Sequence, residues 1–186
     1  MAVEGFLAQE FVSMELPLAS KRGYEEIFAE THHDYELARQ IGDFVTNISV
    51  EFGADTILSP LAVQGHVDHL VTYDAGILTK QALGNRVELI FYEDYPYSRN
   101  KSAYHRRLNR VMGSSALSSE YVAIDDYLDS MADMAIIYRS QFDDVNRDQM
   151  LAIMREDFRA VAMEAKAEGS DTGAECVQRY WRLNES

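Results

Sequence analysis

Two histidines and an aspartate stand close together in the first half of the chain, and their types and spacing suit acid–base or metal chemistry. His66 and His69 are three residues apart, so both imidazoles could lie on one side of a helical turn. Asp68 lies between them, close enough to hydrogen-bond a neighbouring imidazole and fix its tautomer. A helix start also favours an aspartate for its dipole alone. The surrounding elements must decide between a site and a simple helix cap.

The segments around these residues predict a strand, a loop and a helix. Residues 56–58 are β-branched or apolar and run into Pro60, which cannot donate to a central ladder. A helical pattern follows to about Leu83, and residues 87–92 form the clearest strand of the sequence. This order predicts a parallel, right-handed crossover whose two loops open at one edge of the sheet. Ligands bind at such an edge in open α/β sheets.

The remaining segments predict mainly helices. Apolar residues recur at helical spacing in residues 24–52, 124–142 and 147–167, and part of 98–119 predicts a short basic helix. Gly53 is a plausible stop for the first helix, and Asn146 is a natural N-cap for the last. The rest of 98–119 predicts a Ser-rich loop, and residues 176–183 close the chain without an assigned structure.

Composition places the chain among ordinary globular proteins and excludes some partners. The length of 186 residues fits one domain, with 47% hydrophobic and 26% charged residues. A formal net charge of −14 argues against nucleic acid or an anionic membrane as partner. The short basic cluster of His105, Arg106, Arg107 and Arg110 is interpreted as a solvated helix face, with a local anion contact as the alternative. One cysteine, Cys176, and no long apolar run predict a cytoplasmic protein without a signal peptide or transmembrane segment.

Four stretches, in matching order, resemble the PIG-L/LmbE-like metal-dependent N-deacetylases, which remove acetyl groups from amino sugars and related amides. The stretch from Asp55 to His69 resembles the second His motif of that family. The other three are Phe91 to Tyr97 (similar to "YED-x-PY"), Tyr138 to Gln141 (similar to "Y-x-SQ"), and Glu175 with Tyr180–Trp181. The resemblance implies an α/β fold of Rossmann-like, three-layer type with a mostly parallel sheet, in one domain over residues 1–186.

The resemblance also implies roles for individual residues. His69 corresponds to a Zn²⁺ ligand. His66 corresponds to the imidazole that stabilises the tetrahedral intermediate or protonates the leaving amine, with Asp68 orienting it. The substrate, an N-acetylated amino sugar or related amide, would meet residues of the neighbouring loops: Arg22, Tyr92, Glu93, Asp94 and Tyr97. Each of these five has an alternative: solvent exposure for Arg22, a turn position or hydrogen-bonding support of a neighbouring site residue for Glu93 and Asp94, and sheet-edge packing for the tyrosines.

One part of the family pattern is missing. The amino-terminal His-Pro-Asp-Asp-Glu motif, which supplies two zinc ligands and the general base, is not found. The nearest string, from His32 to Glu36, lies within a helical pattern without a preceding strand. We therefore expect the family fold without its first βαβ portion, and one secure zinc ligand where a catalytic zinc normally needs three.

Three hypotheses follow from this pattern. The first is a zinc-dependent N-deacetylase completed by ligands from a homo-oligomer, a complementing chain or upstream sequence. The second is a non-catalytic binding or interaction protein built on the remaining fold, whose exposed sheet edge invites association. The third is a metal-sensing or storage module that combines His32, His33, His66 and His69.

Overall fold

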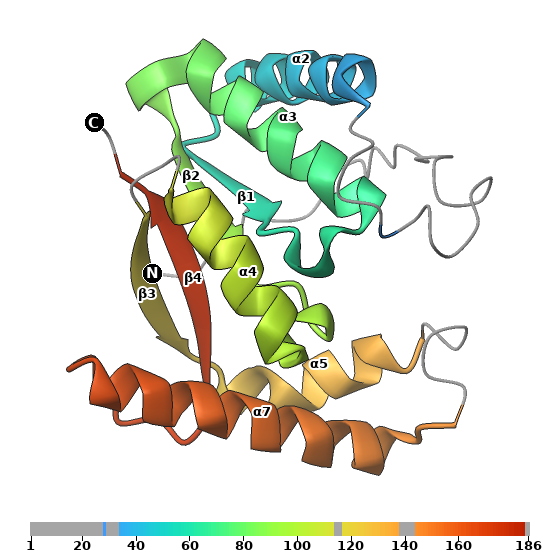
Figure 1. The fold of residues 1–186 in the computed structure, drawn as a ribbon, viewed down its shortest axis with the longest axis vertical. Helices are drawn as coiled ribbons and strands as arrows, with labels where there is room; N and C mark the ends of the chain where they lie inside the picture. The colour runs from blue at the N-terminus through green and yellow to red at the C-terminus, as the bar shows by residue number, and fades with distance from the viewer. Residues whose placement is uncertain (1–27, 29–33, 114–116, 138–143, 185–186) are drawn as a thin grey trace.

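The predicted strand–helix–strand crossover is present and forms one side of a four-stranded sheet (Figure 1). The computed structural model describes residues 28, 34–113, 117–137 and 144–184. Their helices are α2 (Tyr35–Phe52), α3 (Val67–Leu83), α4 (Lys101–Met112), α5 (Leu128–Ala135) and α7 (Arg147–Ala167). Their strands are β1 (Thr56–Pro60), β2 (Glu88–Tyr92), β3 (Leu117–Ala123) and β4 (Val177–Leu183).

The sheet order is β1-β2-β4-β3, and this corrects the expectation of a mostly parallel sheet. β1 pairs with β2 in parallel, but β4 pairs with both β2 and β3 in antiparallel fashion. The reason is that β3 and β4 lie outside the crossover unit, and β4 enters the sheet between β2 and β3 after α7. Neither strand was predicted, because Ser118, Ser119 and the arginines of β4 interrupt the apolar pattern of a strand.

The helix boundaries follow from local chemistry. Asp34 caps α2 by accepting from the backbone N–H of Leu37 at 3.0 Å, and Gly53 ends the helix in the left-handed conformation. α7 begins at the predicted N-cap Asn146, whose side chain accepts from the backbone N–H of Gln149 at 3.0 Å. The Gln149 side chain in turn accepts from the backbone N–H of Asn146 at 2.9 Å, which completes a capping box. The predicted ends of α3 and α7 at Leu83 and Ala167 are confirmed.

One face of the sheet carries the core. Leu89 and Phe91 of β2 are fully buried, together with residues of α3 and α4, and the ring of Tyr73 stacks on Phe91 at 4.8 Å. On the alternate positions Leu58 is 61% exposed and Ile90 is half-buried. The described helices contact the first face of the sheet. A three-layer arrangement needs helices on both faces, so it stays a prediction.

A second core lies at the end of the sheet where β2 stops. It joins α5 and α7 through a set of buried residues that includes Leu128, Met150 and Phe158. Figure 1 shows α5 and α7 side by side at this end, with α2 and α3 at the other. The loops that follow β1 and β2 therefore lie between two packed bodies, which hold them in place.

Candidate functional site

The loop between β1 and α3 has an unusual backbone and is held at several points. Ala62 (φ 61°), Gln64 (φ 65°) and Gly65 (φ 72°) all adopt left-handed conformations, which are unfavourable for the two residues other than glycine. Compensating bonds come from the last residue of β2 and from the loop after it. The Leu61 N–H donates to the carbonyl of Tyr92 at 2.9 Å, and the Val63 N–H donates to Oδ2 of Asp94 at 3.1 Å.

His66 ends this loop and caps α3. Its Nδ1 accepts a hydrogen bond from the backbone N–H of Asp68 at 3.3 Å, whereas the carboxylate of Asp68 lies 3.9 Å away. Since Nδ1 accepts, the neutral ring carries its proton on Nε2. Burial, followed by the neighbouring His69, lowers the pKa of His66, against a weaker opposite effect of Asp68 and Asp94. The neutral imidazole is thus the form favoured here, with a donor on its outer nitrogen.

His69 meets a buried carboxylate. Its Nδ1 lies 2.5 Å from Oδ1 of Asp94, a residue that is 2% exposed. Both atoms are buried, and neither forms a hydrogen bond of regular geometry with any described residue, so the short contact between them stands in place of one. The contact favours a proton on Nδ1 of His69 and leaves the Nε2 lone pair available to a ligand. Asp94 therefore holds both the loop after β1 and the ring of His69.

The ring of His69 belongs to a cluster of four rings. The imidazoles of His66 and His69 lie 5.1 Å apart, and Tyr97 lies 5.3 Å from His69 and 6.1 Å from His66. Phe28 contacts His66 edge-on at 5.4 Å and Tyr97 at 6.0 Å. The structure thus brings together His66, Asp68, His69, Asp94 and Tyr97 from the predicted site residues. Phe28 is an addition, since the sequence placed it on a helical face.

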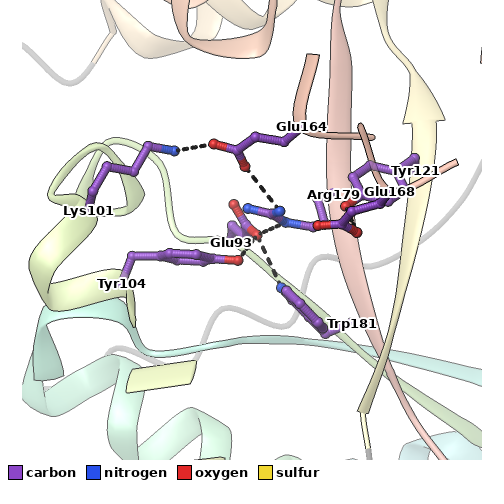
Figure 2. A network of polar contacts seen from close by, with 8 residues as sticks. All are labelled: Glu93, Lys101, Tyr104, Tyr121, Glu164, Glu168, Arg179 and Trp181. Carbon is purple, nitrogen blue, oxygen red and sulfur yellow. Dashed lines mark hydrogen bonds and ion pairs between the residues drawn. The ribbon is translucent and has the colours of Figure 1, made fainter. Parts of the chain in front are cut away.

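Glu93 belongs to a buried polar network (Figure 2). Its Oε1 accepts from the Tyr104 hydroxyl at 2.9 Å, from Nε of Arg179 at 2.5 Å and from the Trp181 indole at 3.1 Å. Arg179, 4% exposed, also pairs with Glu164 at 3.1 Å. Burial and the Glu93 carboxylate raise the pKa of the Tyr104 hydroxyl. These contacts favour the structural alternative for Glu93.

Two of the predicted substrate-binding residues, Tyr92 and Arg22, are not placed in the ring cluster by the structure. Tyr92 is half-buried at the end of β2, where burial, with a smaller effect of Asp94, raises its pKa. Arg22 lies outside the described residues. Within the described part of the chain, no three His, Cys, Asp or Glu side chains are arranged to hold a metal ion. His32 and His33, which the metal-storage hypothesis needs, also lie outside the described residues.

Arg107 shows that the basic cluster is not simply a solvated face. Its Nε donates to the carbonyl of Leu61 at 2.8 Å, and its guanidinium lies 4.4 Å above the ring of Tyr73. Burial lowers the pKa of Arg107. The interpretation of the whole cluster as solvent-exposed is therefore wrong for this residue, which fastens the start of the site loop.

Replacing Arg107 with leucine is expected to lower the free energy of unfolding by about 1–3 kcal/mol, because the buried Leu61 carbonyl loses a charged donor. Denaturant unfolding monitored by circular dichroism measures the change. Arg106→Leu is the matched control, since Arg106 is exposed and bonds Ser102 on its own helix. Equal effects of both substitutions would contradict the role of Arg107.

The chain was compared with known proteins. No family model matches the sequence. Over 95 residues, 50% of the chain, it is 38% identical to a 2'-N-acetylparomamine deacetylase of Streptomyces fradiae. Similar solved structures are the zinc-inhibited form of teicoplanin deacetylase Orf2 (TM-score 0.60, 20% identity) and the pseudoaglycone deacetylase Dbv21 (TM-score 0.60, 21% identity).

The chain shares their fold. The structural matches cover 82% and 81% of this chain, and 53% and 57% of the two solved chains. The curated relative is matched over 32% of its own length. This chain therefore spans about a third of that relative and little more than half of the solved structures. Among the described helices none is long and apolar enough to cross a membrane.

Proposed function

We propose that this chain acts as a zinc-dependent N-deacetylase on a small, sugar-like substrate. Such hydrolysis adds water across the amide C–N bond and releases acetate and a free amine. The single observation that carries the proposal is the His69–Asp94 pair beside His66, at the carboxyl ends of two parallel strands. The 38% identity to a protein named as a deacetylase supports the same reaction class.

The described residues fit one position of a zinc site. With its Nδ1 against Asp94, His69 presents Nε2 in the way that metal-bound histidines usually do. In addition, Oδ1 of Asp68 is buried without a hydrogen-bond partner in the described chain, which favours a cation or a donor nearby. We propose that the other ligands come from a second copy, a complementing chain or upstream sequence, which would also complete the Rossmann-like fold.

A bound zinc ion would polarise the acetyl carbonyl and provide hydroxide near neutral pH. The residues of this chain would orient the substrate and supply hydrogen bonds. His66 can donate from Nε2 to the developing oxyanion or to the leaving nitrogen, because Nδ1 is occupied by the Asp68 N–H. Phe28 and Tyr97 place two aromatic rings beside His66, at 5.4 Å and 6.1 Å.

The test combines metal binding and turnover. Zinc affinity is measured by titration calorimetry, and acetate release is measured with N-acetylglucosamine and 2'-N-acetylparomamine as substrates. We expect zinc-dependent acetate release once the missing ligands are supplied, and little from the chain alone. Tight zinc binding that is unchanged in His69→Ala would overturn the assignment of the metal position. Absence of acetate release from a complemented, zinc-loaded complex would overturn the reaction.

A further inference from the structure

A polar cavity lies next to the histidine cluster, at the same end of the sheet. Its volume is about 510 Å³, and its walls come from the loop after β1, the segment from Glu93 to Lys101, α7 and the start of β4. His66, Asp68, His69 and Asp94 are not among its lining residues. The cavity is therefore distinct from the proposed reacting centre, although both are built from the loops that follow β1 and β2.

The ionised groups of the cavity wall are paired with one another. Asp157 accepts from Nε of Arg99 at 2.9 Å and from the hydroxyl of Tyr95 at 3.0 Å. Arg179 is held by Glu93 and Glu164, as Figure 2 shows, and Lys101 lies 3.4 Å from Glu164. Since each charge has a local counter-charge, the cavity has little net attraction for an ionic ligand.

Neutral hydrogen-bonding groups of the wall remain available. The side chains of Gln64, Ser98 and Gln178 form no hydrogen bond with any described residue. Amides and a hydroxyl can both donate and accept, which suits the hydroxyl groups of a neutral polyol. Tyr95 and Phe158 stack at 5.6 Å and add aromatic surface to the wall. This combination of paired charges, free amides and aromatic surface favours a sugar over an anion.

The site loop connects the cavity to the histidines. Gln64 lines the cavity in a left-handed conformation, and two residues later His66 caps α3 beside His69. Non-glycine residues adopt this conformation only where the surroundings impose it, and such positions cluster at binding sites. Here it is imposed by the bonds from Asp94 and Arg107 to neighbouring loop residues.

We propose that this cavity binds the non-reacting, polyhydroxylated part of a neutral glycoside, while the acetamido group reaches His66 and His69. Only the placement of the acetamido group at His66 and His69 rests on the proposed deacetylase function. Binding of a glycoside in the cavity does not require metal or turnover, and this allows the two proposals to be tested separately.

The experiment is a ¹H–¹⁵N NMR titration of the full chain with methyl α-glucoside, which has no acetamido group. We expect the side-chain amide signals of Gln64 and Gln178 to shift in a saturable way. Gln178→Ala is expected to weaken binding about tenfold, the loss of roughly one hydrogen bond. Gln64→Ala gives a second, independent variant. Gln81→Ala is the control, since Gln81 is an exposed amide on α3.

Each outcome decides one proposal. Shifts confined to other parts of the chain, or equal affinities in all three variants, would overturn the sugar cavity. Stronger binding of inorganic phosphate than of the glucoside at the same amides would overturn its neutral character. Glycoside binding without acetate release from a complemented enzyme would leave the cavity in place and remove the deacetylase. Acetate release without any shift of the Gln64 and Gln178 amide signals would support the deacetylase and overturn the sugar cavity.

Discussion

Replacing Glu93 with glutamine is expected to lower the free energy of unfolding by about 3 kcal/mol. Breaking a buried ion pair by neutralising one partner typically costs about 3–5 kcal/mol, because the other charge stays buried. The lower end applies here, since Arg179 keeps its contact with the partly exposed Glu164. Arg179 also lies above the rings of Tyr104 and Trp181, at 5.1 Å and 5.4 Å.

Thermal and urea unfolding measure this effect, and the sheet provides its own control. Glu120 of β3 pairs with Arg182 of β4, but both side chains are about a third or more exposed. Glu120→Gln should therefore change stability by less than about 1 kcal/mol. Replacing both Glu93 and Arg179 with methionine removes the buried charges but leaves the Tyr104 hydroxyl and the Trp181 indole without their acceptor, so it should restore only part of the loss. A Glu93→Gln variant as stable as Glu120→Gln would rule out the network as a stabilising unit.

Replacing His69 with alanine is expected to remove zinc-dependent acetate release and most of the zinc affinity. Asp94→Asn should have a graded effect, a loss of about 10–100-fold in zinc affinity, because the carboxylate that orients His69 becomes an amide. His105→Ala is the matched control, since His105 is exposed on α4, away from the cluster. Calorimetric zinc titration and acetate assays of the complemented protein provide both readouts.

The ring nitrogens give a readout that does not depend on turnover. In the metal-free wild type, ¹⁵N chemical shifts should report His69 protonated on Nδ1 and His66 protonated on Nε2. Asp94→Asn should change the tautomer distribution of His69 and leave that of His66, which bonds a backbone N–H. A His69 ring with unchanged ¹⁵N shifts in Asp94→Asn would contradict the positioning role of Asp94.

Local chemistry made part of this fold predictable. The crossover from β1 to β2 follows from two apolar runs separated by a helical pattern, and the confirmed caps at Gly53 and Asn146 are encoded within four residues. The same reasoning placed the loops after β1 and β2 at one edge, and the Val63–Asp94 bond confirms that they meet. That much needs no information from distant residues.

The parts that were missed depend on distant partners. Arg179 and Arg182 look unsuitable for a strand until Glu93 and Glu120, 86 and 62 residues away, provide their counter-charges. Likewise, nothing near Phe28 shows that its ring packs against His66. Arg107 appeared exposed because its acceptor, the carbonyl of Leu61, is 46 residues distant. Single-sequence patterns carry no signal for such pairings.

The left-handed residues between Pro60 and His66 have a consequence for the variation that this segment can accept. Asp94 and Arg107 form hydrogen bonds with the backbone of Val63 and Leu61. The side chain of Gln64 lines the cavity, whereas that of His66 caps α3. Exchanging a side chain such as Ala62 for glycine keeps this path. Adding or deleting a single residue changes the number of residues between the bonded Leu61 and the helix cap His66. The side chains that follow the change would then point in the wrong direction. Deep mutational libraries should therefore recover Ala62→Gly while being depleted of insertions and deletions at positions 61–65.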